Sequence, residues 1–222
     1  MKSNKKLLIT IDGPAGAGKT TVSRALAKKL GYNYIDTGAL YRGIAYKARQ
    51  KNITETDDNN LKKICENISL KFINIGEEQH LFSDNKDIEP FIRTEEISML
   101  ASAISAKSFV RKALLQLQRD LGSKKRAVFE GRDMGTVVFP NADIKFFLKA
   151  SVDERAARRY KQLGNDSEQS LYDIKKLIIK RDQNDSQRKL APLKPAEDAI
   201  IIDSTAISAE QATEFMLASI FR

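Results

Sequence analysis

The residues best suited to do chemistry lie near the start of the chain, where positions 13–20 read Gly-Pro-Ala-Gly-Ala-Gly-Lys-Thr. They match the spacing G-x-x-x-x-G-K-[ST], whose glycines let backbone N–H groups approach a phosphate chain closely. An apolar run at 7–11 precedes the loop, and a helix predicted from Thr21 would add its positive dipole end. The alternative is a glycine-rich turn that binds nothing. We expect Lys19 to reach the β- and γ-phosphates and the Thr20 hydroxyl to bind Mg²⁺.

A second polar group follows the predicted strand at 32–35. Asp36 stands at the carboxyl end of that strand, which lies beside the loop in a doubly wound sheet, and Arg42 lies on the helix that follows. The sequence therefore predicts a second ligand-binding segment. The alternative is an ordinary strand-to-helix turn in which Asp36 or Thr37 caps the helix.

A third group follows the predicted strand at 127–129 and reads Glu130-Gly131-Arg132-Asp133-Met134-Gly135. Arg132 can hold a phosphate through two parallel hydrogen bonds, and Asp133 can accept hydrogen bonds from an amino-bearing base. Two acids and an arginine around two glycines favour binding over a plain turn.

Two helical patterns carry further charged residues. In the predicted helix at 171–190, spacings of three and four place six residues on one face, which begins apolar and ends in a polar cleft. These six residues are Leu171, Ile174, Ile178, Arg181, Asp185 and Arg188. In the helix at 152–163, Arg155, Arg158 and Arg159 could close over a triphosphate. For the helix at 171–190, the alternative is that it emerges into solvent after Lys180. For the arginines of the helix at 152–163, the alternative is a solvated basic face.

The apolar segments between these groups alternate as strands and helices, which predicts an α/β fold with a doubly wound, five-stranded parallel sheet of the P-loop NTPase type. The five strands are expected at 7–11, 32–35, 127–129, 144–148 and 199–202. Helices are expected at 20–30, 39–51, 109–121 and 152–163, and the last of these begins with a Ser151/Glu154 capping box. A final helix is expected after a cap formed by Ser208 and Gln211, with Ala212, Phe215 and Ile220 facing inward.

One domain of 222 residues is expected, with a core at 1–56 and 107–222. Three short β-like pieces between Leu70 and Ile88 predict a small inserted α+β subdomain at about 57–106 with an antiparallel sheet. A short helical lid is expected at about 151–170.

Composition narrows the possible partners. The chain has 38 Lys and Arg against 29 Asp and Glu, a formal charge of +9, which predicts an anionic partner. No signal sequence or membrane span is found, so a cytoplasmic location is expected. Cys65 is expected in the core and His80 in a surface turn, and Lys124-Lys125-Arg126 is expected to be a solvated loop rather than a nucleic-acid patch.

These motifs together resemble the bacterial-type cytidylate kinases, the CMP/dCMP kinases of the nucleoside monophosphate kinase group. The resemblance runs nearly from end to end and is most specific at 131–140, Gly-Arg-Asp-Met-Gly-Thr-Val-Val-Phe-Pro. Other matching segments are Asp36-Thr37-Gly38-Ala39-Leu40-Tyr41-Arg42, Ile92-Arg93-Thr94, Val110-Arg111, Arg181-Asp182 and Ala191-Pro192-Leu193.

The resemblance implies roles for residues of this chain. It implies that Arg42, Arg132 and Arg188 hold the acceptor phosphate and that Ser102, Arg111 and Asp133 read the cytosine edge. It also implies that Thr37, Tyr41, Arg181 and Asp185 frame the sugar. ATP would be bound by Asp12, Gly13, Pro14, Ala15, Gly16, Ala17, Gly18, Lys19 and Thr20. The catalytic set would be Lys19, Arg132, Asp133, Arg158 and Arg188, and Asp36 would belong to the substrate-binding set.

The implied reaction is in-line transfer of the ATP γ-phosphoryl group, with Mg²⁺ bound, to CMP or dCMP by a monomer that binds neither nucleic acid nor membrane. Glu130 stands where other members have aspartate, so its relation to the metal stays open. Two other classes remain open from the residues alone. One is a P-loop kinase for another acceptor, such as a different nucleoside monophosphate or shikimate, and the other is a nucleotide switch or nucleic-acid-dependent ATPase.

Overall fold

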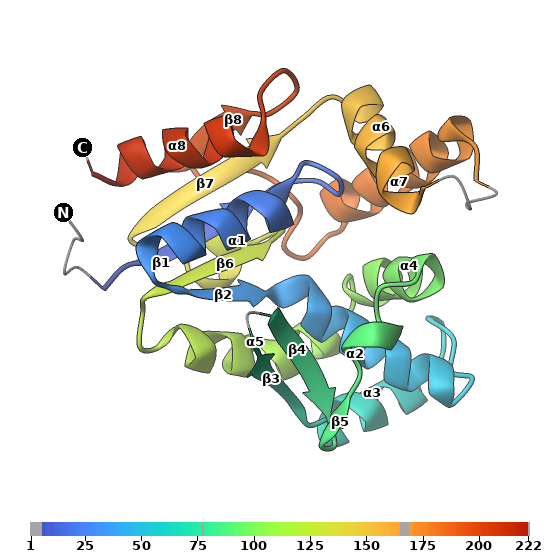
Figure 1. The fold of residues 1–222 in the computed structure, drawn as a ribbon. Helices are drawn as coiled ribbons and strands as arrows, with labels where there is room; N and C mark the ends of the chain where they lie inside the picture. The colour runs from blue at the N-terminus through green and yellow to red at the C-terminus, as the bar shows by residue number, and fades with distance from the viewer. Residues whose placement is uncertain (1–5, 77, 165–168, 222) are drawn as a thin grey trace. The chain divides into compact units, whose positions relative to one another are not determined.

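The computed structural model describes residues 6–76, 78–164 and 169–221, and it contains two compact units (Figure 1). The first unit comprises Met1–Ile35 and Gly122–Arg222, and the second comprises Asp36–Leu121. The second unit extends beyond the predicted subdomain at both ends, because the helices that flank residues 57–106 share its core.

The first unit is built on a five-stranded sheet in the order β2-β6-β1-β7-β8. Its strands are β1 (Leu8–Asp12), β2 (Asn33–Asp36), β6 (Ala127–Gly131), β7 (Ile144–Lys149) and β8 (Ile200–Asp203). Parallel ladders join β1 to β6 and to β7, and β7 to β8. The predicted doubly wound fold is confirmed, with each strand within two residues of its expected bounds.

Helices α1 (Lys19–Leu30) and α8 (Ala209–Ile220) pack together against the sheet (Figure 1). Every residue of β1 is buried, as expected for a strand between two neighbours in a parallel sheet. The core between sheet and helices includes Ile9, Ile11, Val22, Leu26, Val128, Phe146, Leu148 and Met216. The predicted Ser208 capping box is present, but Phe215 is exposed and Met216 takes the inward position.

Helices α6 (Val152–Leu163) and α7 (Leu171–Gln187) pack on each other through Ala156, Ile174 and Ile178. The inward face predicted for α7 needs two corrections. Leu171 is 47% exposed, because it occupies the first turn, before the contact with α6 begins. Arg188 lies just past the last helical residue, in extended backbone, although its side chain is buried. Residues 165–168 of the predicted lid lie outside the described residues.

The second unit combines four helices, α2 (Thr37–Gln50), α3 (Asp58–Asn67), α4 (Glu95–Ile104) and α5 (Ser108–Gly122), with a three-stranded sheet. Its strands β3 (Leu70–Ile75), β4 (Glu78–Ser83) and β5 (Lys86–Asp87) pair antiparallel, as predicted, and a 3₁₀ turn, η1, spans Glu89–Phe91. Cys65 packs at the edge of this unit's core, and burial raises the pKa of its thiol to about 11. His80 lies in β4 rather than a turn, with Nδ1 2.7 Å from Asp87 Oδ2.

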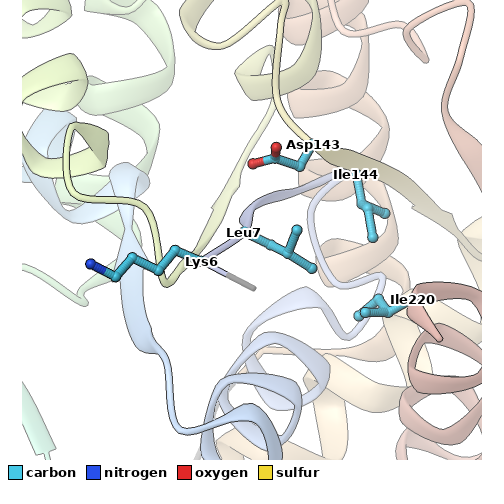
Figure 2. A pocket seen from close by; sticks show the side chains of 5 residues that line it. All are labelled: Lys6, Leu7, Asp143, Ile144 and Ile220. Atoms are coloured by element: carbon cyan, nitrogen blue, oxygen red, sulfur yellow. The ribbon is translucent and has the colours of Figure 1, made fainter. Parts of the chain in front are cut away.

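A cavity of about 440 Å³ lies at the amino ends of β1 and β7, lined by Lys6, Leu7, Asp143, Ile144 and Ile220 (Figure 2). The phosphate-binding loop follows the opposite end of β1, so this cavity is separate from the loop. Among the described residues, no helix is long and apolar enough to cross a bilayer.

Candidate functional site

The phosphate-binding loop joins β1 to α1 in the predicted strand–loop–helix arrangement. Gly13 has φ 151°, and a Cβ there would lie 2.0 Å from the Leu148 carbonyl oxygen, so only glycine fits against β7. Gly18 caps α1 in left-handed backbone and supplies no side-chain acceptor, which leaves the first amides of α1 directed at the loop. This geometry suits an anion.

Lys19 is buried, and its Nζ donates a 2.7 Å hydrogen bond to the Pro14 carbonyl across the loop. Burial, and then the nearby Arg132, lower the pKa of this lysine well below its usual value, while Glu130 opposes the shift.

Thr20 contacts the one carboxylate whose role the sequence left open. Glu130, at 5% exposure, accepts hydrogen bonds at Oε1 from Thr20 Oγ1 at 2.9 Å and from the Tyr34 hydroxyl at 2.8 Å. Tyr34 was not predicted as a site residue, since nothing in its spacing links it to Glu130. A hydroxyl beside a buried carboxylate offers the oxygen donors that Mg²⁺ prefers.

Asp12, which the sequence predicts to bind nucleotide, contacts the turn after β6. Its carboxylate accepts hydrogen bonds from the backbone amides of Met134 and Gly135, at 2.9 Å and 2.8 Å. These amides open η2, a π-helical turn at Met134–Val138. Burial raises the pKa of Asp12 to about 6, although both amides and Lys19 favour its charged form.

The Gly131-Arg132-Asp133 segment and the end of α7 form one buried polar network. Arg132 Nε donates to Asp185 Oδ2 at 2.8 Å, and Arg188 Nη2 lies 3.5 Å from Asp133 Oδ1. Burial alone would lower the pKa of Arg132, but the Asp185 carboxylate raises it above its usual value. Burial opposes ionisation of Asp185, yet Arg132 holds its pKa below the usual range. The structure thus brings together residues that the sequence assigned to two separate segments.

In the second unit, Asp36 is the N-cap of α2 and also an ion-pair partner. Its Oδ1 accepts from the Ala39 amide at 3.2 Å, and its Oδ2 accepts from Arg42 Nη2 at 2.7 Å. Arg93 lies 3.4 Å from the same Oδ2. Burial would raise the pKa of Asp36, but Arg42 and Arg93 lower it. The N-cap and the ion pairs therefore coexist on one carboxylate, while Thr37 is buried at the first position of α2.

Three more predicted residues lie in the second unit. Arg111 stacks over the Tyr41 ring at 5.7 Å and donates from Nη1 to the Ser105 carbonyl at 3.2 Å. The Ser102 hydroxyl is buried in α4 and has no hydrogen-bond partner among the described residues.

The predicted lid arginines differ from one another. Arg155 is 3% exposed, donating to the carbonyls of Ala150 and Ala15 at 3.0 Å each and lying 2.7 Å from Asp182. It is therefore a buried link between α6, the loop and α7 rather than a solvated arginine. Arg158 is half-buried and donates to Glu154 at 2.9 Å. The predicted capping box is only half formed, because Ser151 Oγ accepts from the Glu154 amide but the Ser151 amide donates to Thr205 Oγ1 at 3.0 Å.

Ser204, just after β8, was missed by the sequence analysis because no motif marks it. Its Oγ donates to the Ala17 carbonyl at 3.1 Å, and Arg158 donates to both its hydroxyl and its carbonyl oxygen. Asp203, which imitates a Walker B acid in sequence, is exposed and bonds to Thr205.

Comparison with known proteins gives a consistent result. The family model described as cytidylate kinase matches residues 9–222. The cytidylate kinase of Citrifermentans bemidjiense is 46% identical over 211 residues, 95% of this chain and 91% of that protein. That of Halalkalibacterium halodurans is 42% identical over 214 residues, 96% of each chain.

Among solved structures, a shikimate kinase from Bacteroides thetaiotaomicron superposes with a TM-score of 0.51 at 12% identity, covering 97% of this chain and 99% of that one. A gluconokinase from Sinorhizobium meliloti 1021 gives 0.52 at 16% identity, covering 98% and 93%. At such low identity these two structures show the fold alone. The family match, by contrast, includes both the loop and the Arg132 network, and the chain belongs to the cytidylate kinase family.

Proposed function

We propose that this chain transfers the γ-phosphoryl group of ATP to the 5′-phosphate of CMP and dCMP, giving ADP with CDP or dCDP. The observation that carries the proposal is the buried network of Arg132, Asp133, Asp185 and Arg188 in the same unit as the phosphate-binding loop. Membership of the cytidylate kinase family supports cytidine as the base.

On the donor side, backbone amides of the loop and Lys19 would hold the ATP phosphates. The pKa of Lys19 is low in this structure because burial and Arg132 disfavour its charge, and an adjacent polyphosphate would favour the charged form. Arg158 would add positive charge beside the transferring group. Thr20 would bind Mg²⁺ through its hydroxyl oxygen, and Glu130 would accept the hydrogen bond that this hydroxyl donates.

The protein oxygens near the loop fit Mg²⁺, which keeps several waters and takes one or two protein ligands together with phosphates. Among the described residues, no three or more His, Cys, Asp or Glu are grouped so that they could hold a metal ion. When bound, Mg²⁺ would supply charge neutralisation across the phosphates. Glu130, fixed by Tyr34, would orient the Thr20 hydroxyl.

On the acceptor side, we propose that arginines supply most of the catalytic effect. The acceptor phosphate is already an anion, so no strong base is needed, and the barrier comes from repulsion between two polyanions. The phosphate would be held by Arg42, Arg132 and Arg188. Cytosine would be read by Ser102, Arg111 and Asp133, and the sugar framed by Thr37, Tyr41, Arg181 and Asp185. Asp36 would hold Arg42 in place, as its 2.7 Å contact indicates.

We propose further that the enzyme acts as a monomer in the cytoplasm, in pyrimidine nucleotide metabolism. A single cysteine and the strong positive charge are compatible with a reducing compartment and an anionic substrate. Light scattering at micromolar concentration checks the monomer, and a stable dimer would contradict it.

The reaction is tested by following all phosphorus species by ³¹P NMR after ATP, Mg²⁺ and CMP are mixed with the protein. We expect CDP and ADP to appear in equal amounts, with little inorganic phosphate. Phosphate release without CDP, or turnover that requires added single-stranded RNA, would support the nucleic-acid-dependent ATPase instead.

A further inference from the structure

We propose that Asp12 is a positioning residue, which fixes the turn bearing Arg132 and Asp133 against the start of the phosphate-binding loop and so sets the affinity for the acceptor nucleotide. The inference rests on the proposed function, because it assigns Asp12 to that reaction.

Both oxygens of the Asp12 carboxylate are already used by the turn. Oδ1 accepts from the Met134 amide and Oδ2 from the Gly135 amide, and Asp12 is 4% exposed. The first amides of a helical turn lack acceptors within the turn. One carboxylate satisfies two of them in η2, and charged acceptors make the stronger hydrogen bonds. Asp12 therefore acts as a link between segments rather than as a nucleotide ligand.

The segments on either side of this link carry the chemistry. Asp12 is followed directly by Gly13, which β7 holds so closely that no Cβ would fit. Met134 is preceded directly by Asp133, which is buried and lies 3.5 Å from Arg188. The position of the first residue of η2 thus fixes the position of the Asp133 backbone, and the hydrogen bonds of Asp12 fix the position of η2.

The turn is also closely packed at its second residue. A Cβ on Gly135 would lie 3.1 Å from Thr10 Oγ1 and 3.2 Å from Lys145 Cδ, so the backbone of η2 rests against β1 and β7. Without the Asp12 carboxylate, the two buried amides of η2 would lack their hydrogen-bond acceptor. We expect the turn to shift until these amides find other partners.

Asp143 provides a matched control at the other end of β1. Its Oδ2 accepts from the Leu8 amide at 2.7 Å and its Oδ1 from Lys125 at 2.8 Å. It lines the cavity at the amino ends of the strands (Figure 2), whereas the phosphate-binding loop follows the carboxyl end of β1. Both aspartates thus hold backbone amides at an end of β1, but only Asp12 connects two segments of the proposed site.

The first test compares Asp12→Asn with Asp143→Asn in the full chain. We expect Asp12→Asn to raise the KM for CMP by about tenfold or more, as the loss of a charged hydrogen bond would, and to change the Kd for ATP less than about twofold. Asp143→Asn should lower Tm and leave both constants near wild type. An unchanged KM for CMP in Asp12→Asn, or equal losses for ATP and CMP, would overturn the proposal.

A second test uses wild-type protein and needs no turnover. NMR amide exchange is followed from pH 7.5 to pH 5 at Met134, Gly135 and Leu8. Burial raises the pKa of Asp12 to about 6, with Asp133 adding to the rise and Lys19 opposing it. Lys145 on β7, whose side chain packs near Gly135, donates to the Pro140 carbonyl and to Asp198.

Protonation of Asp12 removes an acceptor, so protection of the Met134 and Gly135 amides should fall near pH 6. The Leu8 amide should stay protected, because Lys125 and the Leu8 amide itself outweigh burial and lower the pKa of Asp143. Parallel behaviour of the three amides would overturn the link. Because exchange needs no CMP, this test stands even if CMP proves not to be the acceptor.

Discussion

At the scale of single residues, two buried lysines have similar surroundings but different expected roles. Lys19 and Lys145 are each 7% exposed, and each donates from Nζ to the carbonyl of a proline, Pro14 or Pro140. Lys145 also donates to a carboxylate, Asp198 Oδ1, at 2.8 Å. Lys19 lies at the end of the phosphate-binding loop, where we propose that it binds the nucleotide phosphates.

Replacing each lysine by methionine separates these roles. Lys19→Met should reduce kcat by about 10³-fold or more, since an in-line charge-neutralising contact is lost. Lys145→Met should lower Tm and keep kcat within about threefold, because a structural ion pair is lost. Steady-state kinetics and thermal unfolding check both. Lys19→Met with near-normal kcat would remove the loop lysine from the mechanism.

Ser102 differs from nearby Ser105 in the hydrogen bonding of its hydroxyl. Its buried hydroxyl has no hydrogen-bond partner among the described residues, whereas Ser105 Oγ on the same segment donates to the Ser102 carbonyl at 2.8 Å. A buried hydroxyl without a hydrogen-bond partner lowers the stability of the folded protein. Binding of a ligand to this hydroxyl would explain why the serine is present despite that cost.

We therefore expect Ser102→Ala to raise the KM for CMP by roughly threefold to tenfold, as loss of one neutral hydrogen bond predicts, without lowering Tm. Ser105→Ala should lower Tm and spare the KM. Calorimetry and acceptor titration measure the two effects. A fall in Tm for Ser102→Ala with unchanged KM would show a purely structural serine.

Single residues were predictable where a contiguous motif or a helical spacing marked them, as the spacing of Arg181, Asp185 and Arg188 did. The glycines, Lys19, Arg132 and Asp133 belong to contiguous motifs. Tyr34 and Ser204 do not, because their partners, Glu130 and Ala17, are brought to them only by the packing of strands distant in sequence.

At the scale of elements, Arg155 links three segments. Its guanidinium bonds the carbonyl of Ala15 in the loop, the carbonyl of Ala150 before α6, and Asp182 in α7. A buried charge of this kind cannot be removed without leaving its partner unpaired.

Arg155→Ala should lower the free energy of unfolding by about 3–5 kcal/mol, the cost of breaking a buried ion pair. Lys161→Ala, at an exposed position of the same helix, should change it by less than about 0.5 kcal/mol. Chemical denaturation measures both. Equal stability of the two variants would mean that Arg155 contributes no more than a solvated lid arginine.

The spacing of apolar residues predicted which segments form helices and strands, but it did not always predict which residues of a helix face inward. The sheet strands were predicted because short apolar runs alternate with amphipathic segments. Leu171 was assigned inward from its helical spacing and Phe215 as part of an inner stripe, yet both are exposed. Met216, next to Phe215, faces the core, and only tertiary packing decides between two adjacent apolar residues of this kind.

At the scale of the whole molecule, Asp12 should make stability depend on pH in an identifiable direction. Its pKa is raised from 3.8 to about 6, so the folded state binds a proton in that range that the unfolded state has lost. Its contribution to the free energy of unfolding should therefore fall as pH rises from about 4 through about 6, by on the order of 3 kcal/mol.

Urea unfolding of wild type and Asp12→Asn between pH 4.5 and pH 7.5 checks this direction. Wild type should lose stability relative to Asp12→Asn as pH rises across that range. Parallel curves would mean that Asp12 titrates at its ordinary pKa. Asp143, whose pKa is lowered, should behave in the opposite way and lose its contribution as pH falls.

The formal charge of +9 indicated an anionic partner but left its class open. The P-loop fold is shared with shikimate kinase and gluconokinase, so fold alone does not identify the acceptor. The 131–140 segment identified the family from sequence because it is long and specific.

The most direct test of the central claim is the specificity ratio of kcat/KM among acceptors, measured with ATP and Mg²⁺ against CMP, dCMP, UMP, AMP and shikimate. We predict the highest values for CMP and dCMP, with the other acceptors lower by about tenfold or more, because loss of a hydrogen bond to a charged group such as Asp133 costs at least that much. Equal or faster turnover with UMP, AMP or shikimate would contradict the assignment of CMP as the acceptor.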